Sequence, residues 1–230
     1  MTDGCFCVER DIMIRKVIGF YYSPIGGSRL LTEKLARDLA EKLNEACPEK
    51  VGFDCYDLED ERTCDLELNE EHVAIIGTPV YMGKIPLPAA KALSKIKGDD
   101  VMTLVSVSYG GRSYGNALFE LQRYAEEAGF KVIGAAAFML FCKTLLSERK
   151  FKAPAIDEDS IVRFETAASG KIARLAGCEV EGLKIKPAPV EAPGHMPVHL
   201  VSRYSPGAAA AAQRLCERLS MKRRQSEWFL

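Results

Sequence analysis

The 230-residue sequence predicts an α/β fold in which a parallel sheet carries helices on both faces. Two observations predict this class. Five short apolar segments have the length and composition of strands, and most of them are followed by a segment with the apolar periodicity of a helix. Strands that alternate with helices along the chain lie parallel, because each helical crossover returns the chain to the same end of the sheet.

The five predicted strands differ in how apolar they are. The first is rich in aromatic residues, the second alternates apolar and polar residues as a less buried strand does, and the third is continuously apolar like a central parallel strand. An acidic segment, residues 59–71, follows the second strand, and we expect it to be a solvated connection. The predicted strands are residues 16–22, 50–57, 72–77, 101–107 and 131–138.

The first predicted helix has the clearest pattern, because leucines recur at every fourth position from Leu31 to Leu43. The last one, after an irregular segment at 139–156, also has a single apolar face and ends before Gly177. The predicted helices are residues 29–46, 87–96, 114–128 and 157–175.

Changes in composition divide the chain into three parts. Residues 1–14 are predicted to be an N-terminal tail, and residues 15–177 an α/β domain of ordinary size. Residues 178–230 are predicted to contain a proline-rich linker, an amphipathic helix over 205–222 and a mobile tail that holds the sole tryptophan, Trp228.

Composition excludes several function classes. With 31 basic and 32 acidic residues, the chain has no net field that favours nucleic acid. It has no long apolar run and its first residues are too polar for a signal peptide, so we expect a cytoplasmic protein without stable membrane insertion. The eight cysteines contain no C-x₂-C pair, which indicates free thiols and no metal site.

The turn Ser23-Pro24-Ile25-Gly26-Gly27-Ser28 connects the first strand to the first helix. Its glycines allow backbone N–H groups to approach an anion, and the start of a helix attracts negative charge. Ser23 and Ser28 can add hydroxyl hydrogen bonds to the same anion. The alternative is an ordinary turn in which Ser28 caps the helix.

Two more glycine-bearing loops follow the third and fourth strands, at 77–86 and 108–115. Loops that follow parallel strands meet at one edge of the sheet, which is where ligands bind in such folds. The sequence has no G-x-x-x-x-G-K-[ST] motif and no G-x-G-x-x-G after the first strand, which argues against a P-loop nucleotide site and a dinucleotide site.

These three loops resemble the flavodoxin family. The first follows the phosphate-loop pattern T/S-x-T-G-x-T at its first, fourth and sixth positions. The resemblance is greatest to the flavodoxin-like domain of bacterial flavodoxin–ferredoxin fusion proteins, which carry S-P-T-G-G-T, G-x-P-V-Y-x-G-x-x-P and Y-G-N-R-x-Y. The resemblance implies a three-layer α/β/α fold with strand order 2-1-3-4-5, and FMN as cofactor.

The resemblance also implies which residues bind the cofactor. The first loop would hold the phosphate, and Tyr81 and Tyr114 are candidates to stack on the flavin ring. No triad or general-base histidine is present, so no catalytic residue is assigned. The predicted FMN-binding residues are Ser23, Ile25, Gly26, Gly27, Ser28, Pro79, Val80, Tyr81, Met82, Gly83, Ser108, Tyr109, Gly110, Gly111, Arg112 and Tyr114.

Three departures from the family pattern bear on function. Ile25 stands where relatives have a threonine that bonds the phosphate, residues 138–142 replace a polar segment, and the ferredoxin cysteines are missing. We expect either an FMN-dependent electron carrier or an NAD(P)H-dependent flavin- or quinone-type oxidoreductase. The alternative is a flavodoxin-like domain that has lost FMN and acts as an interaction or regulatory module. The expected partner is a redox protein or a nicotinamide nucleotide, with homodimer formation left open.

Overall fold

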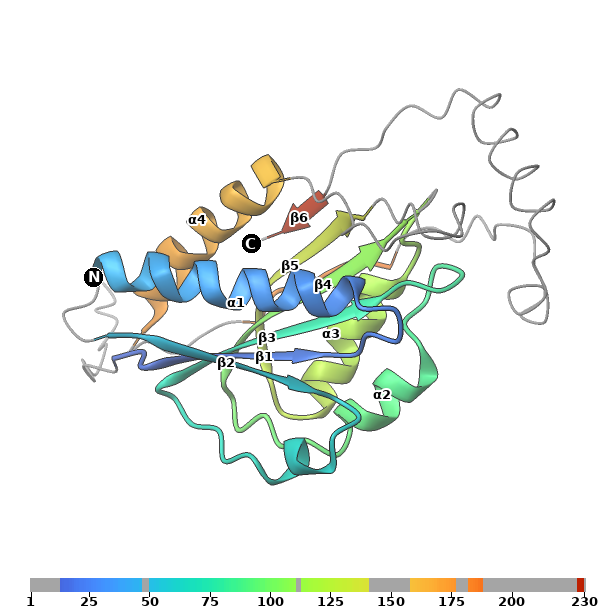
Figure 1. The fold of residues 1–230 in the computed structure, drawn as a ribbon, viewed down its shortest axis with the longest axis horizontal. Coiled ribbons are helices and arrows are strands. Elements are labelled where there is room, and N and C mark those ends of the chain that lie inside the picture. Colours follow the sequence, from blue (N-terminus) through green and yellow to red (C-terminus); the bar gives the residue numbers. More distant parts are fainter. Residues whose placement is uncertain are drawn as a thin grey trace, which may run out of the picture.

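The computed structural model describes residues 13–46, 50–110, 113–140, 158–176, 182–187 and 227–229. Within these ranges the sheet has the strand order β2-β1-β3-β4-β5-β6 (Figure 1). The first five strands are parallel to their neighbours, which confirms the predicted sheet of order 2-1-3-4-5. The strands are β1 (Lys16–Tyr21), β2 (Gly52–Asp57), β3 (His72–Pro79), β4 (Met102–Tyr109), β5 (Lys131–Met139) and β6 (Glu227–Phe229).

Helices cover both faces of the sheet, as the alternating pattern predicts. One face carries α1 and α4 and the other carries α2 and α3 (Figure 1). The acidic connection after β2 contains a short 3₁₀ helix, η1, which the sequence pattern did not indicate. The helices are α1 (Gly27–Ala46), η1 (Glu61–Asp65), α2 (Leu87–Leu93), α3 (Ala117–Glu127) and α4 (Glu158–Leu175).

Each face of the sheet has its own apolar core. On the α1 and α4 face, Leu31 and the three leucines that follow it at four-residue intervals are buried, and the Phe138 and Phe164 rings meet edge to face at 5.8 Å. On the α2 and α3 face, Phe20 and Phe130 meet at 6.0 Å. The strands β1, β3, β4 and β5 are buried on both sides, which is typical of a central parallel sheet, whereas β2 is partly exposed, as its alternating pattern predicts.

The chain beyond α4 contributes to the folded domain. Strand β6 pairs antiparallel with β5, with Phe229 opposite Ala135. The expectation that Trp228 lies in a mobile tail is therefore wrong, since Trp228 pairs with Ala136. Three residues are too few to show strand periodicity, so the sequence pattern could not reveal this strand.

Several predicted features lie outside the described residues. These are most of the N-terminal tail, the boundary at residue 177, the helix predicted over 205–222, and the site residues Gly111 and Arg112. The described cysteines, Cys55 and Cys64, are free thiols, as expected. Among the helices of the described ranges, none combines the length and apolarity needed to cross a bilayer.

Candidate functional site

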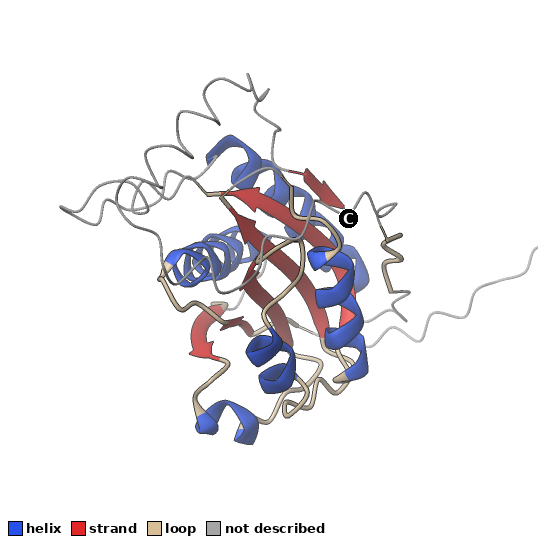
Figure 2. Cartoon of the chain, turned by 90° about the vertical axis from the view of Figure 1, so that its right-hand side faces the viewer, coloured by secondary structure: helices blue, strands red, loops and turns tan. Residues whose placement is uncertain are grey.

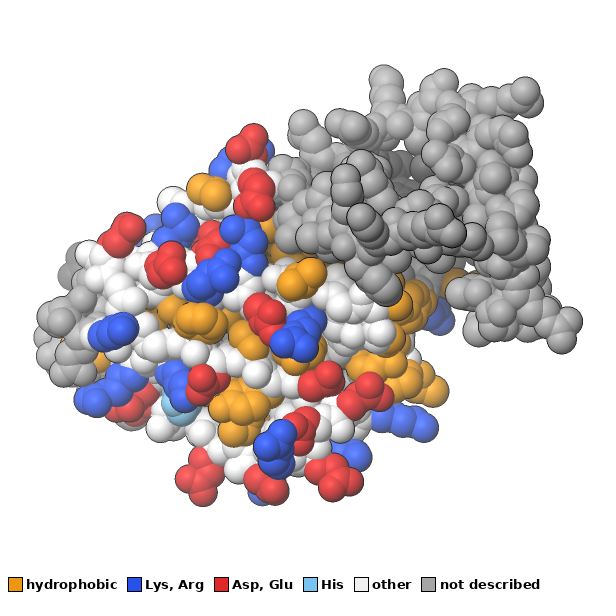
Figure 3. All heavy atoms as spheres, viewed as in Figure 1, with side chains coloured by type: hydrophobic (Ala, Val, Ile, Leu, Met, Phe, Trp, Pro, Cys, Tyr) orange, Lys and Arg blue, Asp and Glu red, His pale blue; other side chains and the backbone are white. Residues whose placement is uncertain are grey.

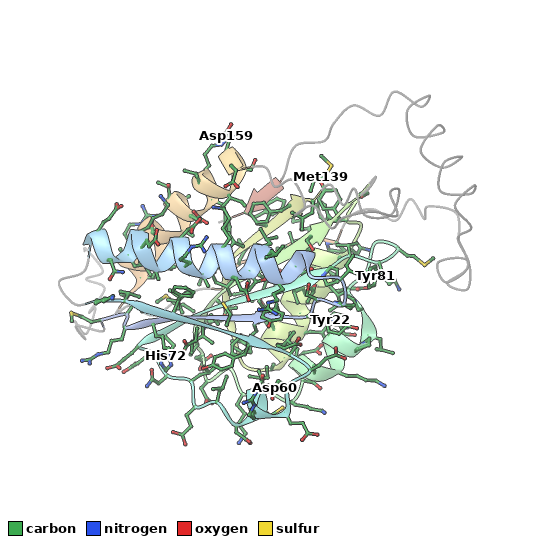
Figure 4. All side chains as sticks on the ribbon, in the orientation of Figure 1. Tyr22, Asp60, His72, Tyr81, Met139 and Asp159 are labelled. Carbon is green, nitrogen blue, oxygen red and sulfur yellow. The ribbon has the colours of Figure 1, made fainter. Side chains whose placement is uncertain are left out.

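The ends of β1, β3 and β4 bring the three glycine-bearing loops to one edge of the sheet, called here the carboxyl edge. Figure 2 views the molecule from this side, and Figure 4 shows Tyr22 and Tyr81 there, far from His72. Backbone hydrogen bonds continue the strand pairing into the loops: the Tyr22 N–H donates to the Gly77 carbonyl at 3.0 Å, and the Val80 N–H to the Ser108 carbonyl at 2.9 Å. The loops therefore start from a fixed framework.

The first loop makes a tight turn into α1. The Gly26 N–H donates to the Ser23 carbonyl at 3.2 Å, and the Arg29 N–H donates to the Ser23 hydroxyl oxygen at 3.0 Å. Gly26 has a φ of 87°, a conformation that other residues adopt only with strain, and the space beside its Cα is open. The turn thus exposes backbone at the start of a 20-residue helix.

Three N–H groups of this loop face no acceptor. Within the described ranges, the N–H groups of Ile25, Gly27 and Ser28 make no hydrogen bond. Unpaired N–H groups at a helix start carry partial positive charge and favour an anion. No carboxylate belongs to the loop itself, and the first acid in the helix, Glu33, pairs with Arg29 at 2.7 Å. The loop is suited to hold an anionic group.

The two predicted hydroxyl ligands of this loop have different positions. Ser23 is partly exposed, whereas Ser28 is buried and its Oγ lies 2.7 Å from the Ser108 Oγ of β4. Ser28 therefore ties the start of α1 to the sheet, a role that its sequence position did not reveal. Ile25, at the position of the missing hydroxyl, has a side chain that is 63% exposed.

A second pair of hydroxyls lies deeper between α1 and the sheet. Thr32 and Ser106 are buried, and their hydroxyl oxygens find no partner among the described residues. Gly77 lies between them: a Cβ there would overlap the Thr32 Oγ1 and come within 3.3 Å of the Ser106 Oγ. The close packing of α1 on β3 beneath the loop thus requires glycine at position 77.

The loop after β3 presents an aromatic ring on a tight turn. Tyr81 and Lys84 exchange both backbone hydrogen bonds, at 2.9 and 3.1 Å, and the two central residues, Met82 and Gly83, have φ values of 55° and 79°. These angles define a type I′ turn. The side chains of Tyr81 and Met82 are 45% and 49% exposed, so this loop offers flat apolar surface.

The phenol of Tyr81 is neutral at pH 7. Partial burial raises the pKa of Tyr81 above its ordinary value of 10.0. The group therefore remains a hydrogen-bond donor beside any ligand at this edge. Pro79 and Val80, the other predicted residues of the loop, lie at the end of β3, where Pro79 is opposite Ser108.

The loops after β3 and β4 pack closely against each other through their glycine backbones. A Cβ at Gly115 would lie 2.7 Å from the Gly83 Cα, and the Asn116 N–H donates to the Gly83 carbonyl at 2.9 Å. Farther along, the Ile85 N–H donates to the Glu120 carboxylate at 3.2 Å. Gly115 has a φ of 54°, which explains why α3 begins at Ala117 and not at the predicted residue 114.

The tyrosines after β4 lie deeper than Tyr81. Tyr109 is buried, and its ring lies 5.6 Å from that of the half-buried Tyr114. Gly110 is exposed, and a Cβ there would lie 3.3 Å from the Leu140 carbonyl oxygen. Of the two tyrosines predicted to stack on a ring, Tyr81 therefore has the more exposed ring, while Tyr114 packs against Tyr109 and the core.

Apolar side chains are exposed around the carboxyl edge, as Figure 3 shows at the end of the molecule where the loop after β3 lies. They come from the first loop, α1, the loop after β3 and the start of α2, and comprise Ile25, Leu30, Tyr81, Met82 and Leu87. Across the described ranges, no three His, Cys, Asp or Glu side chains converge in a way that could hold a metal. The edge thus combines an anion-binding turn with apolar surface.

Comparisons with known proteins agree with this architecture. No family model and no curated protein matches the chain. Among solved structures, an oxidoreductase from Corynebacterium diphtheriae matches with a TM-score of 0.51 and 12% identity, over 72% of this chain and 97% of that one. A flavodoxin from the domain Archaea matches with a TM-score of 0.46 and 19% identity, over 69% of this chain and 99% of that one.

A third match is to part of a longer protein. The rubredoxin oxygen:oxidoreductase of Desulfovibrio gigas matches with a TM-score of 0.44 and 19% identity, over 72% of this chain but 37% of that one. The match to the Corynebacterium diphtheriae oxidoreductase, at 12% identity, shows a shared fold only. The parallel strand order 2-1-3-4-5 with helices on both faces is the flavodoxin-like arrangement, and this chain has that fold.

Proposed function

We propose that this chain binds FMN at the carboxyl edge and acts in electron transfer or flavin-dependent reduction. The observation that supports this best is the first loop, where three unpaired N–H groups surround a glycine turn on the same edge as the exposed Tyr81 ring. The likeness to the flavodoxin part of flavodoxin–ferredoxin fusion proteins rests on the three loop motifs, and the proposed cofactor-binding domain is residues 15–177.

The first loop would hold the phosphate through its backbone. The N–H groups of Ile25, Gly27 and Ser28, together with the Ser23 hydroxyl, provide donors at the positive end of α1. Ser28 would contribute its N–H rather than its hydroxyl, because the hydroxyl belongs to a buried side chain and lies against the Ser108 hydroxyl. Binding would thus depend on the shape of the turn more than on side chains.

The loops after β3 and β4 would hold the flavin ring. Tyr81 offers an aromatic face and Met82 an adaptable apolar one, while Gly110 is exposed and the Gly83 N–H has no partner among the described residues. Bound FMN supplies one- or two-electron redox chemistry, and the protein orients the ring and sets its electrostatic surroundings. The neutral phenol of Tyr81 adds no negative charge next to the ring.

The alternative, a domain that has lost FMN, rests on Ile25 and on the missing ferredoxin cysteines. Because the Ile25 side chain is 63% exposed and its N–H is unpaired, it leaves the turn open. The missing hydroxyl would weaken phosphate binding by about ten- to a hundredfold, as expected for one hydrogen bond to a charged group.

The test compares FMN with riboflavin, which lacks the phosphate. Titration followed by flavin fluorescence should show FMN binding at least about tenfold more tightly, since the phosphate contributes charged hydrogen bonds. Ile25→Asp places a carboxylate at the loop, so it should weaken the binding of FMN but not the binding of riboflavin, which has no phosphate. Val162→Asp, at a 49% exposed apolar position on α4, is the matched control.

Equal affinities for FMN and riboflavin, or an Ile25→Asp variant that binds FMN as the parent does, would contradict the proposed phosphate site. Absence of any flavin binding would contradict the whole proposal. Anaerobic titration of the flavin-loaded protein with NADH and NADPH then separates the two roles: direct reduction indicates an oxidoreductase, and its absence indicates a carrier that needs a protein partner.

A further inference from the structure

A cavity of about 320 Å³ lies on the α3 face of the molecule, next to the proposed flavin site, with which it shares the end of the loop after β4. Its walls come from the start of α3, from the extended segment 182–187 and from β6, which Figure 2 shows at the edge of the sheet near the C-terminus. The volume is at the lower end of the range for small-molecule sites, about 300–1,000 Å³. The residues that carry the argument are Tyr114, Leu118, Phe119, Ile185, Lys186 and Phe229.

One wall is fixed by a buried glutamine on α3. The Gln122 side-chain amide donates to the Leu183 carbonyl, and its Oε1 accepts from the Ile185 N–H at 3.1 Å. The Leu183 N–H donates to the Val132 carbonyl of β5 at 2.7 Å. Gln122 therefore holds segment 182–187 as a neighbouring strand would, and the wall is formed before any ligand binds.

The opposite walls are fixed by the sheet and the loops. Phe229 belongs to β6, which pairs with β5 through Ala135. Gly115 lines the cavity and its backbone packs against Gly83, so this wall is in contact with the loop after β3. Tyr81, in the loop after β3, is not among the residues that line the cavity.

The chemistry of the lining is aromatic and cationic. Three rings, those of Tyr114, Phe119 and Phe229, line the cavity, and the charged residues in its wall are lysines, Lys184 and Lys186. No Asp or Glu of the described ranges belongs to the wall. Aromatic walls favour a flat ring, and lysine ammonium groups favour a negative charge on it.

Two carboxylates of α3 lie near the cavity without belonging to its wall. Glu120, the next residue after Phe119, accepts a hydrogen bond from the Ile85 N–H and is thereby held toward the loop after β3. Glu126, one turn beyond Gln122 on α3, accepts from the Gln122 amide at 2.7 Å. The positive charge of Lys186 has no ion-pair partner among the described residues.

We propose that this cavity binds a planar aromatic carboxylate of about two fused rings, with the rings between Phe119 and Phe229 and the carboxylate toward Lys186. This binding site is additional to the proposed flavin site, and it does not depend on flavin binding.

The probe is 2-naphthoate, and its neutral analogue 2-naphthamide is the ligand control. Isothermal titration of the full chain should show one site for naphthoate, with weaker binding of the amide. Lys186→Glu should lower the affinity for naphthoate by at least about tenfold, since a charge attraction is replaced by a repulsion, and should leave the affinity for the amide unchanged. Phe119→Ala should weaken both ligands.

The matched control is Lys50→Glu, which makes the same charge change at an exposed lysine next to β2, at the opposite edge of the sheet. Titrations run without FMN and with excess FMN separate the two sites: unchanged naphthoate affinity supports the assignment. Displacement by FMN, no naphthoate binding by the parent protein, or unchanged affinity in Lys186→Glu would each overturn it.

Discussion

The buried carboxyl of Glu165 should make the protein less stable as pH rises. Glu165, on α4, is 2% exposed, and its Oε1 has no hydrogen-bond partner among the described residues. Burial, reinforced by the Asp38 carboxylate of α1, raises its pKa from 4.5 to about 8, although Lys34 and Lys42 oppose this shift. Lys34 is itself engaged with Asp38 at 2.7 Å and with Glu158 at 3.1 Å.

The direction and size follow from proton linkage. Between pH 4.5 and about 8 the folded protein retains a proton that the unfolded chain releases, so stability falls with rising pH across that window and levels off above it. At about 1.4 kcal/mol for each pH unit, the penalty of the ionised group approaches about 5 kcal/mol at most. Below pH 4.5 both states hold the proton, and the group contributes no pH dependence.

The perturbation is Glu165→Gln, which keeps the shape and removes the charge. Urea unfolding should show the variant and the parent with similar free energies of unfolding at pH 5, and the variant more stable by about 2–5 kcal/mol at pH 9. Glu41→Gln, at an exposed position on α1, is the matched control and should retain the pH dependence of the parent. A difference between the Glu165→Gln variant and the parent that stays constant from pH 5 to pH 9 would refute the reasoning.

Three further predictions concern the loops and segment 182–187. Gly115→Ala should lower the free energy of unfolding by about 1–3 kcal/mol and weaken FMN binding, because the new Cβ would clash with Gly83. Gly52→Ala, where a Cβ has no neighbour within 4 Å, should change stability little, and equal effects of the two variants would contradict the packing argument. Ile25→Thr should tighten FMN binding by about tenfold in a fluorescence titration, and an unchanged dissociation constant would show that a hydroxyl at this position does not reach the phosphate. Gln122→Leu should lower the free energy of unfolding by about 1–3 kcal/mol in urea, since it removes the partners of two backbone groups in segment 182–187; a change under about 0.5 kcal/mol would show that water replaces them.

Features of the fold that depend on a local, repeated pattern of apolar residues could be predicted from the sequence. The leucines of α1 predicted which face is buried, and the continuous apolar run of β3 predicted a central strand. The common edge of the three loops follows from the parallel strands alone. The strand order needed the family resemblance, because periodicity does not say which strands are neighbours.

The contacts that shape the site could not be predicted because they join distant residues. Ser28 and Ser108 are 80 positions apart, and nothing in either local pattern distinguishes a hydroxyl that binds an anion from one that binds another hydroxyl. The same holds for Gln122 and Leu183, 61 positions apart, and for the pairing of β6 with β5. A glycine at 115 signalled a turn, but only the fold shows that it meets Gly83.

The pairing of Ser28 changes what the departure at Ile25 means. In the proposed site two of the three side-chain positions expected to bind the phosphate place no hydroxyl at it, one because it is isoleucine and one because its hydroxyl is buried beside Ser108. The donors that remain are three backbone N–H groups and Ser23, and their directions are set by the turn at Gly26 and the axis of α1. Backbone donors are not lost by substituting the side chains that carry them, provided that the turn keeps its shape. An anion site built this way tolerates a hydrophobic residue at position 25, and its selectivity comes from the geometry of the helix start and from the rings beside it.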